Sequence, residues 1–302
     1  MLLRLLPLCS LLLLCTCDRA SDPTTGPDPL PPVVNVRTTL RYAATDNVPE
    51  DRQSVDVYHP ESWTERQPLV VYVHGGAWVV GDKRNNIEEK AELFRDMGYV
   101  FASVNYRLVQ VVGDDGQTVE SAFPAYHDDA ANAVATLLDQ AAQFGIDPER
   151  VVLFGHSAGA QIVSALGTNP EFLNAHGYGP GDLRGVISND TEGHDVAARV
   201  ALGSEAYVNA FGTDADDHRR ASPLQNVAET ENAPAWLVLY QGSVRRQNVN
   251  RAFVDALAAA GEEATGVFVP EYTHERMNRE VGVAGETLVT EPIREFLREV
   301  ME

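Results

Sequence analysis

The chain alternates between continuous apolar runs and segments in which apolar residues recur every three to four positions. Leu69–Val73 is an uninterrupted apolar run, which is typical of a strand buried on both faces of a sheet. Ile87, Ala91 and Phe94 then recur at helical spacing, and Gly98 follows where a helix C-cap is expected. Because strands and helices alternate in this way, the pattern predicts a doubly wound, mostly parallel sheet.

The same pattern predicts a sheet of about eight strands, connected mainly by helices. The first two strands alternate apolar and polar residues, as in an antiparallel pair. We expect strands at 33–42, 54–58, 69–73, 99–104, 151–154, 186–188, 236–240 and 267–269. Helical spacing continues at 130–144, 253–260 and 292–300, and a helix is expected directly after residue 157. We see no internal repeat, so a single domain is expected at 33–302.

The first residues do not share this pattern. Leu5–Leu14 is an apolar segment that is too short to span a bilayer as a helix, so residues 1–17 are interpreted as a secretory signal. Residues 18–32 are rich in Pro, Asp, Thr and Gly and are expected to form an extended linker. We therefore expect an exported protein of the periplasm or cell envelope.

Cys17 ends this signal in a context that resembles a bacterial lipoprotein box, with Leu14 three residues before it and Thr16 directly before it. Two alternatives stay open. A lipid on Cys17 would tether the chain to a membrane, whereas plain cleavage near Ala20 would not. The three cysteines of the chain all lie in this segment, so disulfides are expected to play no part in the folded domain.

Composition narrows the range of partners. The chain carries 44 acidic and 23 basic residues, with a formal net charge of −21. No cluster of Lys and Arg interrupts this balance, so nucleic acids and other polyanions would be repelled. The histidines lack convincing zinc-ligand spacing, and neither a metal nor a cofactor is expected. The expected partner is a small molecule, and the oligomeric state is left open.

The most informative motif is Gly155-His156-Ser157-Ala158-Gly159, placed between a predicted strand and a predicted helix. A serine between two glycines in this context forms a sharp elbow that lifts its hydroxyl above the edge of a parallel sheet. We therefore predict that Ser157 is a nucleophile and that the amide of Ala158 faces a developing oxyanion. The alternative is an ordinary helix N-cap serine.

Two further segments complete the predicted chemistry. Gly75 and Gly76 directly follow the first buried strand, and glycines there allow backbone amides to turn inward as an oxyanion hole. His74, beside them, is interpreted as a residue that braces the loop. His274 follows the last predicted strand, where a general base is expected if the chain order is serine, acid, histidine.

With these motifs in place, the chain resembles the α/β-hydrolase superfamily. The similarity is to small carboxylesterases related to bacterial feruloyl esterase-like lipases, kynurenine formamidases and the hormone-sensitive-lipase group. It rests on Ser54–Tyr58, His74–Trp78, Gly81–Lys83, Asn105–Leu108, Phe123–Ala125, Asp128 and Gly155–Gly159. The resemblance implies an α/β-hydrolase fold and a structural ion pair between Arg107 and Asp128.

The chain departs from this family at the acid. Arg245 stands where a carboxylate usually follows the penultimate strand. Three alternatives stay open. Asp190, after the preceding strand, could act as the acid; Asn248 or a backbone carbonyl could orient His274 without charge; or there is no functional triad. Losing the acid costs about 10⁴-fold in kcat in a well-studied triad.

The sequence therefore predicts a serine hydrolase of the carboxylesterase type, which cleaves small carboxylic esters through an acyl-enzyme on Ser157 with His274 as base. An arylformamidase-like amide hydrolase is the close alternative. A non-catalytic binding protein on a hydrolase scaffold is the other, and Arg245 is the observation that favours it.

Overall fold

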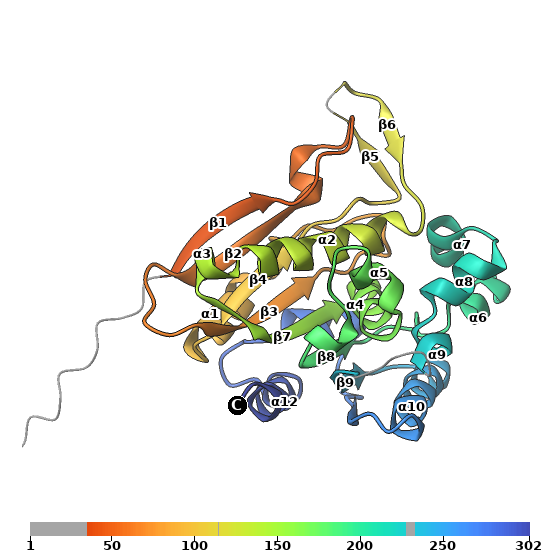
Figure 1. The fold of residues 1–302 in the computed structure, drawn as a ribbon. Coiled ribbons are helices and arrows are strands. Elements are labelled where there is room, and N and C mark those ends of the chain that lie inside the picture. The colour runs from red at the N-terminus through yellow and green to blue at the C-terminus, as the bar shows by residue number, and fades with distance from the viewer. Residues whose placement is uncertain (1–34, 114, 228–232) are drawn as a thin grey trace, which may run out of the picture. The chain divides into compact units, whose positions relative to one another are not determined.

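The computed structural model describes residues 35–113, 115–227 and 233–302 (Figure 1). The signal predicted at 1–17, with Cys17, and the linker predicted at 18–32 lie outside the described residues. Among the residues that are described, none of the helices has the length and apolar character needed to cross a bilayer.

Within the described residues, eight strands form one sheet in the order β1-β2-β4-β3-β7-β8-β9-β10. β1 pairs antiparallel with β2, β2 pairs antiparallel with β4, and all later pairs are parallel. The strands are β1 (Asn35–Arg41), β2 (Ser54–Pro60), β3 (Gln67–Val73), β4 (Val100–Val104), β7 (Ile146–His156), β8 (Gly185–Asn189), β9 (Ala235–Tyr240) and β10 (Ala264–Phe268). The predicted eight-stranded, mostly parallel sheet with an antiparallel N-terminal pair is confirmed.

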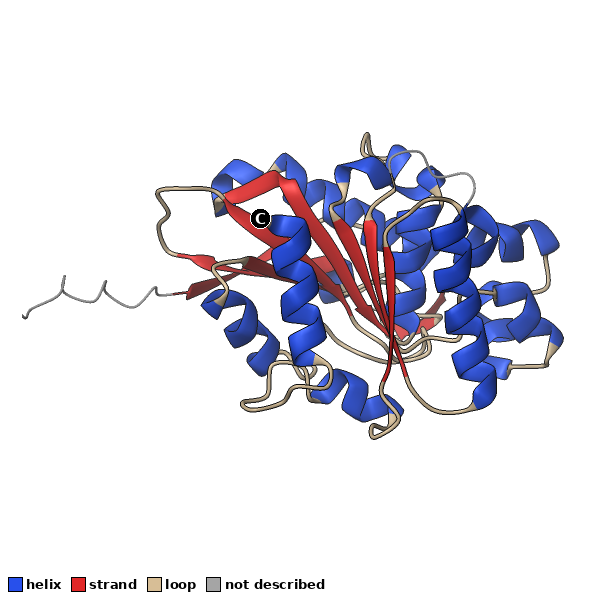
Figure 2. Cartoon of the chain, turned by 90° about the horizontal axis from the view of Figure 1, so that it is seen from below, coloured by secondary structure: helices blue, strands red, loops and turns tan. Residues whose placement is uncertain are grey.

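Helices cover both faces of this sheet (Figure 2). They are α1 (Glu88–Asp96), α2 (Ala125–Asp139), α3 (Ala141–Phe144), α4 (Ala158–Thr168), α5 (Pro170–Asn174), α6 (Val196–Ala201), α7 (Glu205–Phe211), α8 (Ala215–Ala221), α9 (Pro223–Asn226), α10 (Val244–Ala259), α11 (His274–Arg279) and α12 (Thr290–Met301). Two short 3₁₀ helices lie at Glu50–Gln53 and Pro180–Asp182, and β5 (Gln110–Val112) pairs with β6 (Thr118–Glu120) as a separate antiparallel hairpin.

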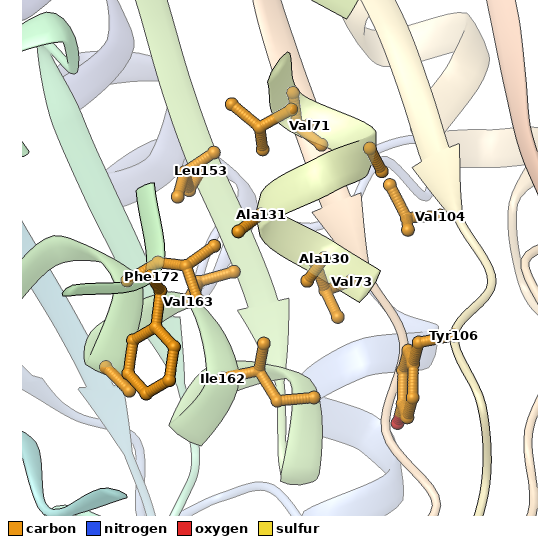
Figure 3. Packing of buried hydrophobic residues seen from close by; sticks show 14 of the residues in the cluster. Val71, Val73, Val104, Tyr106, Ala130, Ala131, Leu153, Ile162, Val163 and Phe172 are labelled. Atoms are coloured by element: carbon orange, nitrogen blue, oxygen red, sulfur yellow. The ribbon is translucent and has the colours of Figure 1, made fainter. Parts of the chain in front are cut away.

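The central strand β3 shows why its sequence is uniformly apolar. Val71 and Val73 belong to the core shared with α2 and α4, which Figure 3 shows from close by. Val70 and Tyr72 alternate with them and pack into the core formed with α1 and α12. All four side chains are buried, because helices cover the strand on both sides.

Some local predictions were wrong. The helix expected to run through 130–144 ends at Asp139, and Gln140, with φ −103° and ψ 16°, separates α2 from α3. The strand expected at 151–154 is longer, because β7 starts at Ile146 and ends at His156. The β5–β6 hairpin and the short helices α6 to α9 were not predicted, since segments of three to seven residues carry little periodicity.

The parallel strands bring distant segments to one edge of the sheet. β3, β7 and β8 are neighbours in register, so their carboxyl ends at Val73, His156 and Asn189 lie side by side. The segments that follow these ends are the glycine loop, the serine elbow and the loop of Asp190. This topology gathers the predicted functional residues at one place.

Candidate active site

Ser157 occupies a sharp turn between β7 and α4, with φ 57° and ψ −114°, a conformation that non-glycine residues rarely adopt. The flanking glycines allow the turn to pack closely. A Cβ on Gly155 would lie 2.2 Å from the carbonyl oxygen of Gly159, and a Cβ on Gly159 would lie 2.0 Å from that of Val73. The backbone N–H of Ser157 donates to the carbonyl of Asn189 at 3.0 Å, which fixes the turn to β8.

His274 reaches Ser157 from the other end of the chain. It is the first residue of α11, whose N-cap Thr273 accepts a hydrogen bond from the amide of Arg276. The distance from Nε2 of His274 to Oγ of Ser157 is 2.8 Å. His156 contacts the backbone of His274, with its Nε2 2.9 Å from the carbonyl oxygen of that residue. Burial lowers the pKa of His156 to about 3, so this ring is neutral at pH 7. Sequence reasoning gave His156 no such role.

Asp190 is the group that the structure places on the far side of the imidazole. It directly follows β8, adopts φ 58° and is fully buried. Its Oδ2 lies 2.7 Å from Nδ1 of His274, and the amide and side chain of Gln241 donate to its two oxygens at 3.3 and 2.9 Å. A partner at Nδ1 selects the tautomer whose Nε2 can accept the proton of Ser157.

The charge of Asp190 follows from competing effects. Burial by itself would raise the pKa of this carboxyl. The hydrogen bond from His274 and the nearby charge of Arg246 outweigh burial, so the pKa of Asp190 lies below its ordinary value. The ionised carboxylate can therefore accept a hydrogen bond from Nδ1–H and stabilise an imidazolium.

Arg245 holds the sequence position at which the family has its acid, but its side chain is not the group that contacts Nδ1 of His274. Its side chain is 60% exposed and pairs with Glu192 at 2.9 Å. Asn248 lies in the wall of an apolar surface groove, so it is not the residue placed on Nδ1 of His274. The neighbouring Arg246 is the arginine that reaches the site, at 3.0 Å from Oδ1 of Asp190.

His74 braces the glycine loop. Its Nδ1 lies 2.7 Å from the carbonyl oxygen of Gly75, its ring stacks on Tyr106 at 4.4 Å, and the hydroxyl of Tyr106 donates to its carbonyl at 3.0 Å. Burial lowers the pKa of His74 to about 4, so the ring is neutral at pH 7. These contacts suit a residue that fixes the loop.

The glycines of the loop pack tightly beside the elbow. A Cβ on Gly75 would lie 3.0 Å from Cβ of Ser157, so only glycine allows this approach without a shift. Gly76 adopts φ 125°, and its carbonyl accepts the amides of Val79 and Val80, both at 3.0 Å. This tight turn brings the loop backbone against the serine.

A cavity of about 110 Å³ opens at the elbow. It is walled by the glycine loop, the serine elbow, the loop after β8, α7, the first turn of α10 and the start of α11. The lining residues are Ala77, Trp78, Ser157, Ala158, Asp190, Thr191, Glu192, Ala206, Tyr207, Arg246 and His274. Gly75 and Gly76 instead line a second cavity of about 460 Å³. Ala77 is therefore a loop residue at the serine that sequence reasoning missed, and its position directly after the two glycines was the available signal.

The ion pair implied by the family resemblance is wrong by one residue. Arg107 binds Asp129, with Nε and the backbone N–H donating to Oδ2 and Nη2 donating to Oδ1, each at 2.8 Å. Asp128 and Asp129 both lie in α2, where one position turns the side chain by about 100°. Asp129 is buried and Asp128 is only half-buried, so the inward-facing position is Asp129.

No group of three or more His, Cys, Asp or Glu side chains is arranged to hold a metal ion within the described part of the chain. The close groups at the elbow are a hydroxyl, an imidazole and a carboxylate, linked by hydrogen bonds. This arrangement can activate a serine for attack on a carbonyl carbon.

Comparison with known sequences identifies relatives among esterases. Residues 55–177 match the BD-FAE family, a span that includes the glycine loop and the elbow but neither Asp190 nor His274. The chain is 30% identical over 211 residues to a para-nitrobenzyl esterase of Bacillus subtilis, covering 64% of this chain and 41% of the relative. It is 30% identical over 142 residues to carboxylesterase NlhH of Mycobacterium tuberculosis, covering 47% and 40%. The matches thus span about two fifths of these relatives.

Solved structures extend the similarity to most of the chain. A truncated carbohydrate esterase from gut microbiota superposes with a TM-score of 0.70 at 18% identity, covering 87% of this chain and 96% of that one. Carboxyl esterase 2 of the fungus Tuber melanosporum superposes with a TM-score of 0.66 at 18% identity, covering 90% and 89%. At this level of identity the likeness is one of fold, and the predicted α/β-hydrolase fold is confirmed.

Proposed function

From the premise that this chain has an α/β-hydrolase fold, we propose that it is a serine hydrolase of the carboxylesterase type. Ser157 gives its proton to Nε2 of His274 and attacks the ester carbonyl carbon. The imidazolium then gives that proton to the departing alcohol, which leaves an acyl group on the serine. Water, deprotonated by His274, releases the carboxylic acid and restores the serine.

The observation that carries this proposal is the continuous chain of hydrogen bonds at the elbow. Ser157 lies 2.8 Å from Nε2 of His274, and Nδ1 of the same ring lies 2.7 Å from Asp190. Both distances are within the range in which a base accepts a proton and an acid orients that base. The three residues come from three segments that are far apart in the sequence and meet only at the sheet edge. Their contact is therefore a property of the tertiary structure and does not follow from any one segment.

Stabilisation of the oxyanion is assigned to the backbone. Ala158 is the first residue of α4, and the first amides of a helix have no partner within the helix. The loop of Gly75 and Gly76 lies against the serine from the other side, and Ala77 lines the cavity beside it. One such donor contributes about 10²–10³-fold in rate.

The size of the cavity supports esters with a short acyl group. About 110 Å³ is available between the elbow and Tyr207. Trp78 closes one wall and is held by edge contacts with Tyr207 at 5.0 Å and Phe211 at 4.9 Å. The names of the relatives, a para-nitrobenzyl esterase and a carboxylesterase, support carboxylic esters as the substrate class.

The alternative of a non-catalytic binding protein loses its main support. It depended on a cation in the place of the acid, whereas Arg245 points to Glu192 and Asp190 supplies the carboxylate. The arylformamidase alternative uses the same nucleophile and base, so substrate comparison must separate it from an esterase.

Turnover of p-nitrophenyl acetate and of an N-formyl aromatic amide by the wild type and by Ser157→Ala tests the proposal. We expect ester turnover that exceeds amide turnover, and a loss of about 10⁴-fold or more in kcat for the variant. Ser62→Ala, at an exposed serine, is the matched control and should keep full activity. Equal rates in the wild type and Ser157→Ala would overturn the proposal, and preferential amide turnover would favour the arylformamidase.

A further inference from the structure

Arg246 contacts both the acid and the base of the proposed triad. Its Nη1 lies 3.0 Å from Oδ1 of Asp190, 3.2 Å from the backbone oxygen of Asp190 and 3.2 Å from Nδ1 of His274. The residue stands in the first turn of α10, which Ser243 caps by accepting the amide of Arg246. A full positive charge therefore lies against the ring nitrogen that faces the acid.

The site protects this charge from solvent. The side chain of Arg246 is 19% exposed and that of Asp190 is fully buried, so their interaction is screened less than a surface pair. Glu192 is the second carboxylate near Arg246, at 3.6 Å from Nη2, and it is shared with Arg245 and Arg199. The shortest carboxylate contact of Arg246 is therefore with Asp190.

The other charged and titratable groups around His274 come from every element packed against it. Besides Arg246 on α10, they are Asp190 and Glu192 after β8, His156 at the end of β7, Tyr207 on α7, and Glu275 and Arg276 beside His274 on α11 itself. His156 is held neutral by burial, with its ring 4.7 Å from that of His274. Among the described residues, Arg246 is the cation for which the structure records a contact with Nδ1.

We propose that Arg246 is a positioning residue that keeps Asp190 ionised and oriented toward Nδ1 of His274. The proposal rests on the proposed function. Arg246 has this effect on Asp190 because a cation stabilises the charged form of a neighbouring carboxylate. The activity therefore persists to lower pH than it would with Asp190 alone.

The readout is the acid limb of the pH profile. Because Arg246 also opposes the imidazolium that forms during turnover, its effect on the plateau rate combines opposing contributions. The pH at which kcat/KM falls to half its plateau instead reports whether the acid and the base are in their active protonation states. A purely structural residue would change the plateau without moving this limb.

The experiment compares kcat/KM for p-nitrophenyl acetate between pH 4 and 9 in the wild type, Arg246→Gln and Arg246→Lys. We expect the acid limb of Arg246→Gln to move to higher pH by roughly one unit. Arg246→Lys keeps the charge and should keep the limb within a few tenths of a unit of the wild type. Arg245→Gln is the matched control, because this exposed arginine binds Glu192 and not the triad, and its limb should not move.

Labelling of Ser157 by a fluorophosphonate separates failure of this proposal from failure of the proposed function. If Arg246→Gln is labelled and the acid limb of its kcat/KM profile lies at the wild-type pH, the proposal for Arg246 is wrong, while the proposed hydrolase activity is still supported. Equal shifts in Arg246→Gln and Arg246→Lys would also overturn it, because shape rather than charge would then govern the limb. Absence of labelling in the folded wild type would contradict the proposed function itself.

Discussion

Nδ1 of His274 lies 2.7 Å from Oδ2 of Asp190, a carboxylate that is fully buried. Asp190 reaches this position through a left-handed backbone conformation, with φ 58°, directly after β8. Its amide donates to the carbonyl of Leu239 at 2.7 Å, so the turn is fixed to the neighbouring strand β9. Asp190 is thus held by the sheet edge and does not depend on a flexible loop.

This geometry predicts the effect of Asp190→Asn. The amide nitrogen of asparagine can donate a hydrogen bond to Nδ1 and select the wrong tautomer of His274, while the shape of the site is kept. We expect kcat for p-nitrophenyl acetate to fall by about 10⁴-fold, with little change in the unfolding transition. Glu192→Gln, at the neighbouring acidic residue, should lose less than tenfold; a similar loss in both variants would contradict the assignment of the acid.

The elbow predicts a strong requirement for glycine at position 159. A Cβ there would lie 2.0 Å from the carbonyl oxygen of Val73, which is backbone and cannot rotate away. We expect Gly159→Ala to yield little soluble, folded protein. Gly203→Ala is the control, because this glycine has φ 71° and an added Cβ would meet no atom within 4 Å, and it should cost only about 1–2 kcal/mol in urea unfolding. Normal folding of Gly159→Ala would show that the elbow is looser than described.

The pair of Arg107 and Asp129 predicts a difference between two adjacent aspartates. Asp129 is buried and also accepts a hydrogen bond from the side chain of Gln53 at 2.9 Å. Removing it leaves Arg107 without its carboxylate partner, so Asp129→Ala should lower the free energy of unfolding by roughly 3–5 kcal/mol. Asp128→Ala, measured by the same denaturant titration, should change it by less than about 1 kcal/mol. The reverse order would restore the pair expected from the family resemblance.

Buried histidines predict a loss of stability in acid. Burial lowers the pKa of His127 and of His194 to about 3, from 6.5 in the unfolded chain. The unfolded chain therefore binds more protons, and the stability that is complete above pH 6.5 is lost as the pH falls toward 3. Each histidine contributes about 1.4 kcal/mol per pH unit within this window.

Denaturant unfolding between pH 7 and 4 measures this slope, and His194→Gln should make it shallower by the contribution of one proton. The side chain of His194 stacks on Phe253 at 4.0 Å, so the variant will also be less stable at pH 7, but that loss does not depend on pH. An unchanged slope in the variant would show that His194 is not a source of the acid sensitivity.

Much of the fold could be predicted because the signals were local. Apolar runs such as Leu69–Val73 mark buried strands, and the two glycines around Ser157 are required by contacts within a few ångströms. His274 could be placed from chain order alone, since the base of this type of site follows the last strand. These predictions needed no knowledge of which distant segments meet.

The acid could not be settled in this way. Carboxylates follow several of the strands. Which of them can contact the imidazole depends on which strand end faces it, and the sequence pattern does not report this long-range property. The sequence therefore leaves Asp190 as one of three alternatives, and its contact with His274 is a finding of the structure. The ion pair of Arg107 failed for a related reason, because choosing between Asp128 and Asp129 requires the rotation of α2 about its axis.

The most direct test of the account is covalent labelling of the folded protein by a fluorophosphonate, with the modified residue mapped by mass spectrometry. We predict stoichiometric labelling at Ser157 in the wild type, no labelling in Ser157→Ala or after denaturation, and much slower labelling in His274→Ala. A folded wild-type protein that leaves Ser157 unmodified would contradict the central claim that the imidazole of His274 activates this hydroxyl.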